Sequence, residues 1–127
     1  MEKIQAHMMG ASISSNSQDA FSLCKKSHFG EQVGEKIQYS LSETLFLTEK
    51  GKMKVFHKKK WLPFKELIRK VYSNDKRINI KYPVFKSLRE KGYVVKTALK
   101  FGADFRVYDR GSKPGEEHAK WIVFADH

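Results

Sequence analysis

The sequence predicts a mixed α/β fold in which helices pack against β-sheet. Residues 105–108 alternate between apolar and polar side chains, which is typical of a strand with one face against a core. Residues 64–72 carry apolar side chains at intervals of three and four, the period of an amphipathic helix. Because both periods occur in one chain, we expect strands and helices together.

Residues 1–39 are expected to form short strands joined by turns. Three segments are candidates for strands: residues 4–9, 20–23 and 32–39. The segment 11–19 is rich in serine and asparagine and is expected to be a loop. Cys24 and His28 are four residues apart, a spacing that two metal ligands can have, but no second pair completes a zinc site. We interpret them as a half-buried thiol and a surface imidazole.

A helix is predicted from Ser40, because Ser40 and Glu43 fit a capping box. Gly51 is expected to end this helix. Met53 and Val55 then alternate with lysines, which predicts a short strand with one face in water.

Residues 58–61 are three lysines followed by a tryptophan. Such a group can hold phosphates while the indole ring stacks on a base. It can equally be a solvated turn whose tryptophan packs on the next helix, and we prefer this second interpretation.

Two further helices are predicted. The first begins after Pro63 and has an apolar stripe made of Phe64, Leu67, Ile68, Val71 and Tyr72. The second covers part of residues 77–91, with Pro83 near its start or at a kink. Gly92 is a suitable end for it.

Residues 93–125 are expected to form three strands, of which the last two make a hairpin. Phe105 and Val107 should face a core. The loop of the hairpin contains three turn-forming residues, Gly111, Pro114 and Gly115. Residues 121–124 are a continuous apolar run, which predicts a strand buried on both faces.

The hairpin carries two side chains that are suited to proton transfer. Arg106 and Tyr108 share the strand face that looks away from the predicted core. A hairpin folded symmetrically about Lys113 brings Tyr108 opposite His118, with their Cβ atoms about 5 Å apart. The same register brings Arg106 opposite Lys120.

The composition favours a polyanionic partner. Lysine and arginine total 25 against 14 acidic residues, for a net charge of +11, and phosphate contacts supply much of the affinity of proteins for nucleic acids. A single cysteine excludes an internal disulfide. No apolar run approaches the roughly 20 residues that cross a bilayer, and the N-terminus shows no signal-peptide core. We therefore expect no membrane partner.

Five runs near the C-terminus resemble the tRNA-splicing (tRNA-intron) endonuclease family. They are Tyr93-Val94-Val95-Lys96-Thr97, the run 100–108, Arg110-Gly111, Pro114-Gly115 and His118-Ala119-Lys120-Trp121. Residues 82–92 resemble the helix that precedes the first core strand of that family, and residues 40–47 resemble a helix of its N-terminal domain. The resemblance implies a small N-terminal domain, which we place at residues 1–75, and a restriction-endonuclease-like catalytic domain at residues 76–127.

The resemblance also implies a chemistry. RNA carries its own nucleophile, the 2′-hydroxyl beside each phosphodiester, so no metal or other cofactor is required in principle. By motif, Tyr108 matches the family's general base and His118 its general acid. The products would be a 2′,3′-cyclic phosphate and a 5′-hydroxyl. Arg106, Arg110 and Lys113 are expected to contact substrate phosphates, and the substrate implied is the bulge-helix-bulge of precursor tRNA.

The sequence departs from the family after the strand that carries the histidine. Family members continue through further strands and a helix, which hold the catalytic lysine and an acidic loop that docks into a partner subunit. No lysine of this sequence matches that position, so the catalytic domain is expected to be incomplete. We therefore expect a homo- or hetero-oligomer with other splicing-endonuclease subunits, cytoplasmic if archaeal and nuclear if eukaryotic.

Three alternative functions remain open. The strongest is a non-catalytic structural or RNA-binding subunit of a splicing endonuclease. The run 100–108 also looks like the aromatic strand of RNA-recognition domains, although Asp104 would lie among stacked bases. A metal-dependent nuclease would use Asp104 and Asp109, but no Glu-x-Lys motif follows them.

Overall fold

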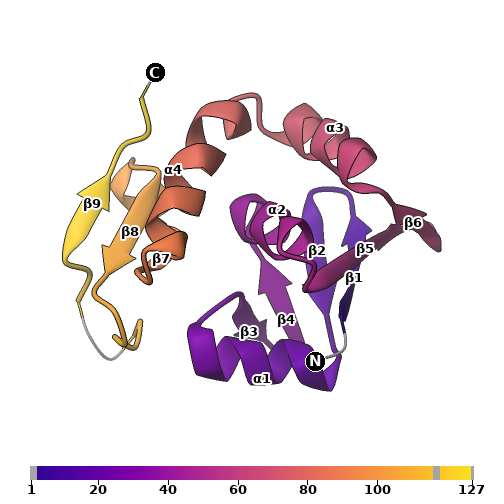
Figure 1. Ribbon diagram of the computed structural model, residues 1–127, viewed down its shortest axis with the longest axis horizontal. Helices are drawn as coiled ribbons and strands as arrows, with labels where there is room; N and C mark the ends of the chain where they lie inside the picture. The colour runs from indigo at the N-terminus through magenta and orange to yellow at the C-terminus, as the bar shows by residue number, and fades with distance from the viewer. Residues whose placement is uncertain (1–2, 116–117, 127) are drawn as a thin grey trace. The chain divides into compact units, whose positions relative to one another are not determined.

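A computed structural model describes residues 3–115 and 118–126 of the chain (Figure 1). The chain divides into two compact units, residues 1–78 and 79–127, which we describe separately. Each unit contains both helix and sheet, so the predicted mixed α/β class is confirmed.

The first unit is built on a six-stranded sheet. Its strands are β1 (Ile4–Met9), β2 (Ser12–Ser15), β3 (Glu31–Val33), β4 (Lys36–Tyr39), β5 (Met53–His57) and β6 (Lys60–Leu62). They lie in the order β3-β4-β2-β1-β5-β6, and only β1 and β5 pair in parallel within the described sheet. Its helices are α1 (Gln18–Ser27), α2 (Leu41–Glu49) and α3 (Phe64–Asn74).

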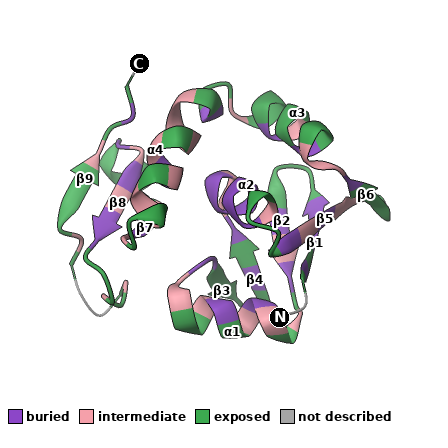
Figure 2. Ribbon diagram, in the orientation of Figure 1, coloured by how far each residue is buried: buried purple, intermediate pink, exposed green. Residues whose placement is uncertain are grey.

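The core of the first unit lies between one face of this sheet and the three helices. Alternate strand residues are fully buried, among them Ile4, Ile13, Ile37 and Val55. From the helices, Ala20, Leu47, Leu67 and Val71 are equally buried, and α2 contains mostly buried residues (Figure 2). Burial of each large aliphatic side chain contributes about 1.5–3 kcal/mol. The hydrophobic effect therefore fixes which sheet face the helices cover.

Three expectations for the N-terminal segment were wrong. Residues 20–23 lie in α1 rather than in a strand, because the Ser17 hydroxyl accepts a hydrogen bond from the Ala20 N–H at 3.2 Å and caps a helix there. Part of the predicted loop forms β2, in which Ile13 is buried. Residues 32–39 also contain a turn at Gly34, so they contribute to two strands rather than one.

The predicted capping box of α2 is confirmed. The Ser40 hydroxyl accepts from the Glu43 N–H at 3.2 Å, and the Glu43 carboxylate accepts from the Ser40 N–H at 2.9 Å. The second carboxylate oxygen of Glu43 accepts from the Gly30 N–H at 2.8 Å. One buried side chain therefore joins the start of α2 to the loop before β3.

The second unit is a helix packed on a three-stranded antiparallel sheet. It contains α4 (Ile78–Glu90, which begins at the unit boundary), β7 (Val94–Thr97), a short 3-10 helix (Leu99–Phe101), β8 (Phe105–Tyr108) and β9 (Trp121–Val123). The strands follow the order β7-β8-β9. The ring of Phe85 on α4 lies 5.8 Å from that of Phe105 on β8, at an interplanar angle of 49°, so α4 covers the face that was predicted to be core. Pro83 lies inside α4, and Gly92 adopts a positive φ just beyond its end.

The expected burial of the last strand is wrong. Trp121, Ile122 and Phe124 are 44%, 46% and 66% exposed, and Figure 2 shows β9 exposed beside the buried β8. In the described sheet β9 is an edge strand with a single neighbour.

None of the helices in the described residues has the length and apolar character needed to span a membrane.

Candidate catalytic site

Arg106 and Tyr108 lie side by side on one face of β8, as the strand alternation predicts. The guanidinium of Arg106 donates from Nη1 to the Tyr108 hydroxyl at 3.2 Å. It also donates from Nε to the backbone carbonyl of Thr97, on β7, at 2.7 Å. The second bond anchors Arg106 across the sheet, so the cation is held against the phenol rather than free to swing into solvent.

Tyr108 and His118 line the same cavity. The cavity has a volume of about 380 Å³ and is lined by Phe101, Arg106, Tyr108, Gly115, His118, Ala119 and Ile122. His118 is exposed, whereas Tyr108 is only 3% exposed. The burial of Tyr108 differs from the open strand face that we expected. Its hydroxyl nevertheless keeps a polar partner in Arg106, so the phenol is not enclosed by apolar groups alone.

The predicted register of the hairpin is wrong by two residues. Arg106 pairs with Ile122 rather than with Lys120, and the backbone N–H of Lys120 donates to the Val107 carbonyl at 2.9 Å. The ladder is centred on Pro114 instead of Lys113. A shift of two residues keeps every side chain on its original face, which explains why His118 still reaches the cavity beside Tyr108.

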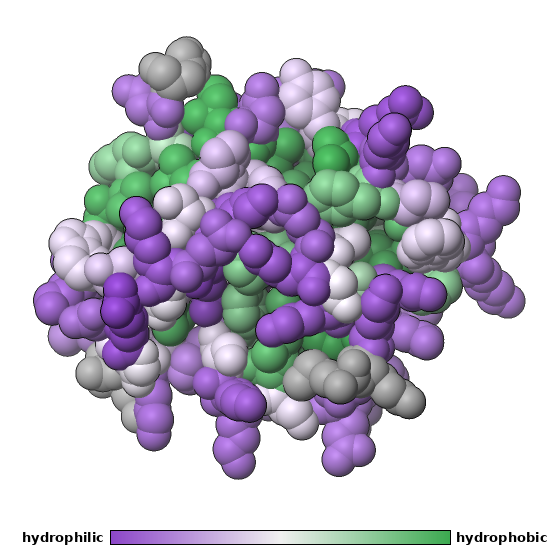
Figure 3. Space-filling view, viewed as in Figure 1, coloured by the Kyte–Doolittle hydropathy of each residue, from purple (hydrophilic) through white to green (hydrophobic). Residues whose placement is uncertain are grey.

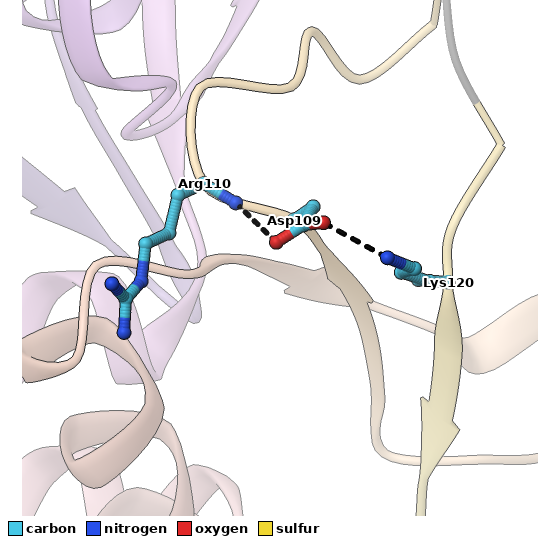
Figure 4. Close-up of polar contacts among 3 residues, drawn as sticks. All are labelled: Asp109, Arg110 and Lys120. Atoms are coloured by element: carbon cyan, nitrogen blue, oxygen red, sulfur yellow. Dashed lines mark hydrogen bonds and ion pairs between the residues drawn. The ribbon is translucent and has the colours of Figure 1, made fainter.

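Lys120 is engaged at the mouth of the hairpin. Its ammonium forms an ion pair with the Asp109 carboxylate at 2.9 Å, and the other carboxylate oxygen accepts from the Arg110 N–H at 3.0 Å (Figure 4). The hydrogen bond from Lys120 lowers the pKa of Asp109 below its ordinary value, and the Arg110 N–H and the charge of Lys120 act in the same direction. Both side chains are exposed, so the pair contributes little to stability.

Arg110 and Lys113 are not among the residues that line the cavity. The Arg110 guanidinium lies over the Tyr93 ring, 5.4 Å from its centroid, and Figure 4 shows its side chain directed away from Asp109 and Lys120. Of the three cations predicted to bind phosphate, the structure brings only Arg106 beside Tyr108. Phosphate binding by Arg110 and Lys113 stays a prediction.

The lining residues that the sequence did not indicate include Phe101 and Ile122. Phe101 follows β7 on the 3-10 helix and is mostly exposed, and Ile122 is the register partner of Arg106. The alternation of β9 could have identified Ile122 if the register had been known. No local pattern distinguishes Phe101 from an ordinary surface aromatic.

The described residues hold no group of three or more histidine, cysteine or acidic side chains that could bind a metal ion. The Cys24 thiol donates to the Gly30 carbonyl at 3.7 Å, and His28 adopts a positive φ where α1 ends. Cys24 and His28 therefore both have structural roles at the end of α1, and their spacing does not indicate a metal site.

Sequence comparison separates the two units in the same way. Residues 4–68 match the family model described as tRNA intron endonuclease, N-terminal domain, and residues 78–127 match tRNA intron endonuclease, catalytic C-terminal domain. The chain belongs to the tRNA intron endonuclease family. The matched catalytic region contains β8, β9 and the whole cavity described above.

Members of this family from archaea are similar to the chain over most of its length. A tRNA-splicing endonuclease of Thermococcus onnurineus is 45% identical over 102 residues, which cover 80% of this chain and 58% of the relative. One from Thermococcus gammatolerans is 40% identical over 119 residues, covering 93% and 69%. One from Nanoarchaeum equitans is 42% identical over 90 residues, covering 66% and 58%. The chain therefore spans between about half and two thirds of these curated relatives.

Proposed function

We propose that the chain is an RNA endonuclease, acting as a subunit or as part of one, that excises introns from precursor tRNA. The observation that carries the proposal is the shared cavity of Tyr108, His118 and Arg106 in the region that matches the family's catalytic domain. A phenol, an imidazole and a fixed cation around one space are the groups that transesterification of RNA needs. The three relatives described above are archaeal, so we expect the protein to act in the cytoplasm.

The reaction needs two proton transfers and one stabilised charge. The phenolate form of Tyr108 takes the proton from the ribose 2′-hydroxyl, and so becomes the phenol, as that oxygen attacks the neighbouring phosphorus. His118 donates a proton to the 5′-oxygen as its bond to phosphorus breaks, because the ordinary pKa of imidazole lies near neutral. The products are a 2′,3′-cyclic phosphate and a 5′-hydroxyl. The nucleophile belongs to the substrate, so we expect cleavage to continue in EDTA.

Arg106 supplies positive charge to this reaction. Its guanidinium is already fixed by bonds to Thr97 and Tyr108, and a pre-oriented cation stabilises the charge that develops on phosphate oxygens. The family triad also contains a lysine, which no residue of this sequence matches by motif. We propose that a further segment or a partner subunit supplies it. The exposed apolar side chains on the edge strand β9 support such pairing.

The substrate is recognised through its phosphates and its shape. The chain carries a net charge of +11, and hydrophilic side chains cover much of the face seen in Figure 3. Arg110 and Lys113 border the hairpin loop and would contact RNA outside the cavity. Recognition by shape suits the flipped bases of a bulge-helix-bulge, because the major groove of RNA is too narrow to read.

A second candidate is a non-catalytic subunit of a splicing endonuclease. The near-complete burial of Tyr108 favours it, because a general base must reach the 2′-hydroxyl of the substrate. In this case the Tyr108–Arg106 bond would serve stability, and the chain would contribute RNA binding or assembly contacts alone.

Cleavage of an intron-containing precursor tRNA in EDTA tests the proposal. The wild type, with any protein that co-purifies with it, is compared with Tyr108→Phe and His118→Ala. Tyr93→Phe is the matched control, because this ring lies outside the cavity against Trp121. We expect each cavity variant to lose about 10²–10⁴ in rate and the control to cleave normally. Equal cleavage by all variants would reject the assignment, and absence of cleavage in every sample together with retained RNA binding would favour the second candidate.

A further inference from the structure

The sheet of the first unit has a second face that the three helices leave uncovered. The strand residues that alternate with the core positions lie on it, and all are exposed or half-buried: Gln5, His7, Met9, Ser12, Ser14, Lys36, Gln38, Lys54, Phe56 and Trp61. We call these residues the open sheet face. A solvated sheet face is expected to be polar, but this one also carries aromatic side chains.

Three ring-bearing side chains form a row across the open sheet face. His7 of β1 is the register partner of Phe56 of β5, and Phe56 is the partner of Trp61 of β6. The rings of His7 and Phe56 are 5.8 Å apart with an interplanar angle of 32°. Trp61 is 55% exposed, so the expectation that it packs on the next helix is wrong. Neighbouring strands are about 4.8 Å apart, which sets the spacing of the row.

Lysines surround this row. The Lys54 ammonium lies 5.3 Å from the Trp61 ring centroid. A hollow of about 350 Å³ is lined by His7 and Phe56 together with Lys36 and Lys58.

An adjoining hollow extends the basic surface along β1. It has a volume of about 400 Å³, shares His7 and Asn16 with the first, and adds Lys3 and the acidic residue Asp19. Together the two hollows are lined by three lysines and one carboxylate, so the local charge is positive.

We propose that the open sheet face binds single-stranded RNA, with bases stacked on His7, Phe56 and Trp61. Exposed aromatic rings offer a stacking surface to any base, and cations beside them neutralise the backbone phosphates. Lys36, Lys54 and Lys58 are placed to do so. A paired duplex hides the faces of its bases, so it cannot use the row of rings. The inference takes only the choice of RNA from the proposed function, and it does not depend on cleavage at Tyr108 and His118.

Binding of a labelled single-stranded oligonucleotide by the full chain tests this inference. The probe is about 12 nucleotides long, within the range of known single-strand sites, and carries 2′-O-methyl groups, which remove the nucleophile for cleavage. Fluorescence anisotropy at constant salt gives the Kd. We expect His7→Ala and Trp61→Ala each to weaken binding about 5-fold to 100-fold. Trp61→Tyr keeps a ring and should retain most of the affinity.

Tyr72→Ala is the matched control. Tyr72 lies on α3, is 42% exposed, and has the Lys76 ammonium 4.9 Å from its ring. The substitution therefore removes an equivalent lysine–aromatic pair outside the open sheet face, and the Kd should not change. Circular dichroism of each variant shows whether the fold is retained.

Tryptophan fluorescence gives a second readout. The chain has two tryptophans, so Trp121→Phe leaves Trp61 as the single reporter. We expect the single strand to quench it and the matching duplex to leave it unchanged.

Two results would overturn the inference. One is unchanged affinity in folded His7→Ala and Trp61→Ala variants, and the other is equal affinity for single strand and duplex. Loss of binding in Lys36→Ala without any effect of the ring substitutions would show attraction to phosphate alone and would also reject stacking. The probe has no nucleophile and its binding is measured without cleavage, so failure of this inference and failure of the cleavage proposal are separate outcomes.

Discussion

The guanidinium of Arg106 donates a hydrogen bond to the hydroxyl of Tyr108 at 3.2 Å while a second bond ties it to the Thr97 carbonyl at 2.7 Å. Arg106 therefore has two roles in the proposed reaction. It holds the phenol in one orientation, and it keeps a positive charge at the wall of the cavity that His118 also lines.

Arg106→Gln should therefore lower the rate of cleavage at saturating substrate by about 10²-fold, the usual effect of removing one fixed donor from a reacting centre. Single-turnover cleavage of precursor tRNA measures it. Arg110→Gln is the comparison, because Arg110 lies over Tyr93 outside the cavity. That variant should weaken substrate binding and leave the rate at saturation unchanged. Equal rates for the two variants would contradict a role for Arg106 at the reacting phosphate.

Among the carboxylates of the first unit, Glu43 is the one whose removal is expected to lower the free energy of unfolding most. Its two oxygens accept from the N–H groups of Ser40 and Gly30. Glu43→Ala leaves both donors without this acceptor and should lower the free energy of unfolding by roughly 2–5 kcal/mol. Urea denaturation measures the loss.

Glu66→Ala is the control for this experiment. Glu66 is exposed and lies in the first turn of α3, the position that Glu43 has in α2. The change should cost less than about 1 kcal/mol. Similar losses in both variants would mean that the link from Glu43 to Gly30 contributes nothing.

The capping box shows which parts of the fold a sequence can predict. Ser40 and Glu43 signal a helix start within four residues, and Gly92 marks an end just as locally. Ser17 carried the same kind of signal for α1, but the serine-rich surroundings favoured a loop. Side-chain faces also follow locally from alternation, which is why Arg106 and Tyr108 were placed together correctly.

Features that depend on distant residues were not predictable in this way. The burial of Tyr108 and the exposure of Ile122 are set by what packs on each face of the sheet, and no local pattern records it. The hairpin register, which is centred on Pro114, does not follow from the turn-forming composition of the loop. The row of His7, Phe56 and Trp61 required the pairing of β1 with β5 and of β5 with β6.

Tyr39 should make the first unit sensitive to alkali. Its hydroxyl is buried without a hydrogen-bond partner in the described structure. Burial raises the pKa of Tyr39, and the charges of Glu43 and Cys24 add to the increase. The unfolded chain releases this proton near pH 10, whereas the folded chain retains it. Above that pH, ionisation stabilises the unfolded state relative to the folded one, and the free energy of unfolding falls as the pH rises.

Tyr39→Phe should remove most of this dependence, since phenylalanine has no proton to release. The urea midpoint of wild type and variant, followed between pH 8 and about pH 11 across the ordinary tyrosine pKa, measures the difference. The same decline in both proteins would assign the alkaline sensitivity to other groups.

Substitution of Lys120 tests whether the hairpin itself supplies the lysine of the proposed triad. Its ammonium is paired with Asp109 at 2.9 Å, and both side chains are at least half exposed, at 59% and 50%. Because Lys120 lowers the pKa of Asp109, the contribution of the pair is complete above the ordinary carboxyl pKa of about 3.9 and is lost only as the pH falls further, through the lowered pKa of Asp109. The pair is therefore intact at neutral pH, where Lys120 is engaged away from the cavity.

Lys120→Met should accordingly leave the cleavage rate within about threefold of the wild type, because an exposed ion pair contributes little. Single-turnover rates at neutral pH, measured together with any protein that co-purifies, give the answer. Asp109→Asn is the companion variant, since it breaks the pair and keeps the lysine. A loss of 10²-fold or more in Lys120→Met alone, the size expected for a catalytic cation, would show that Lys120 leaves Asp109 and acts on the phosphate.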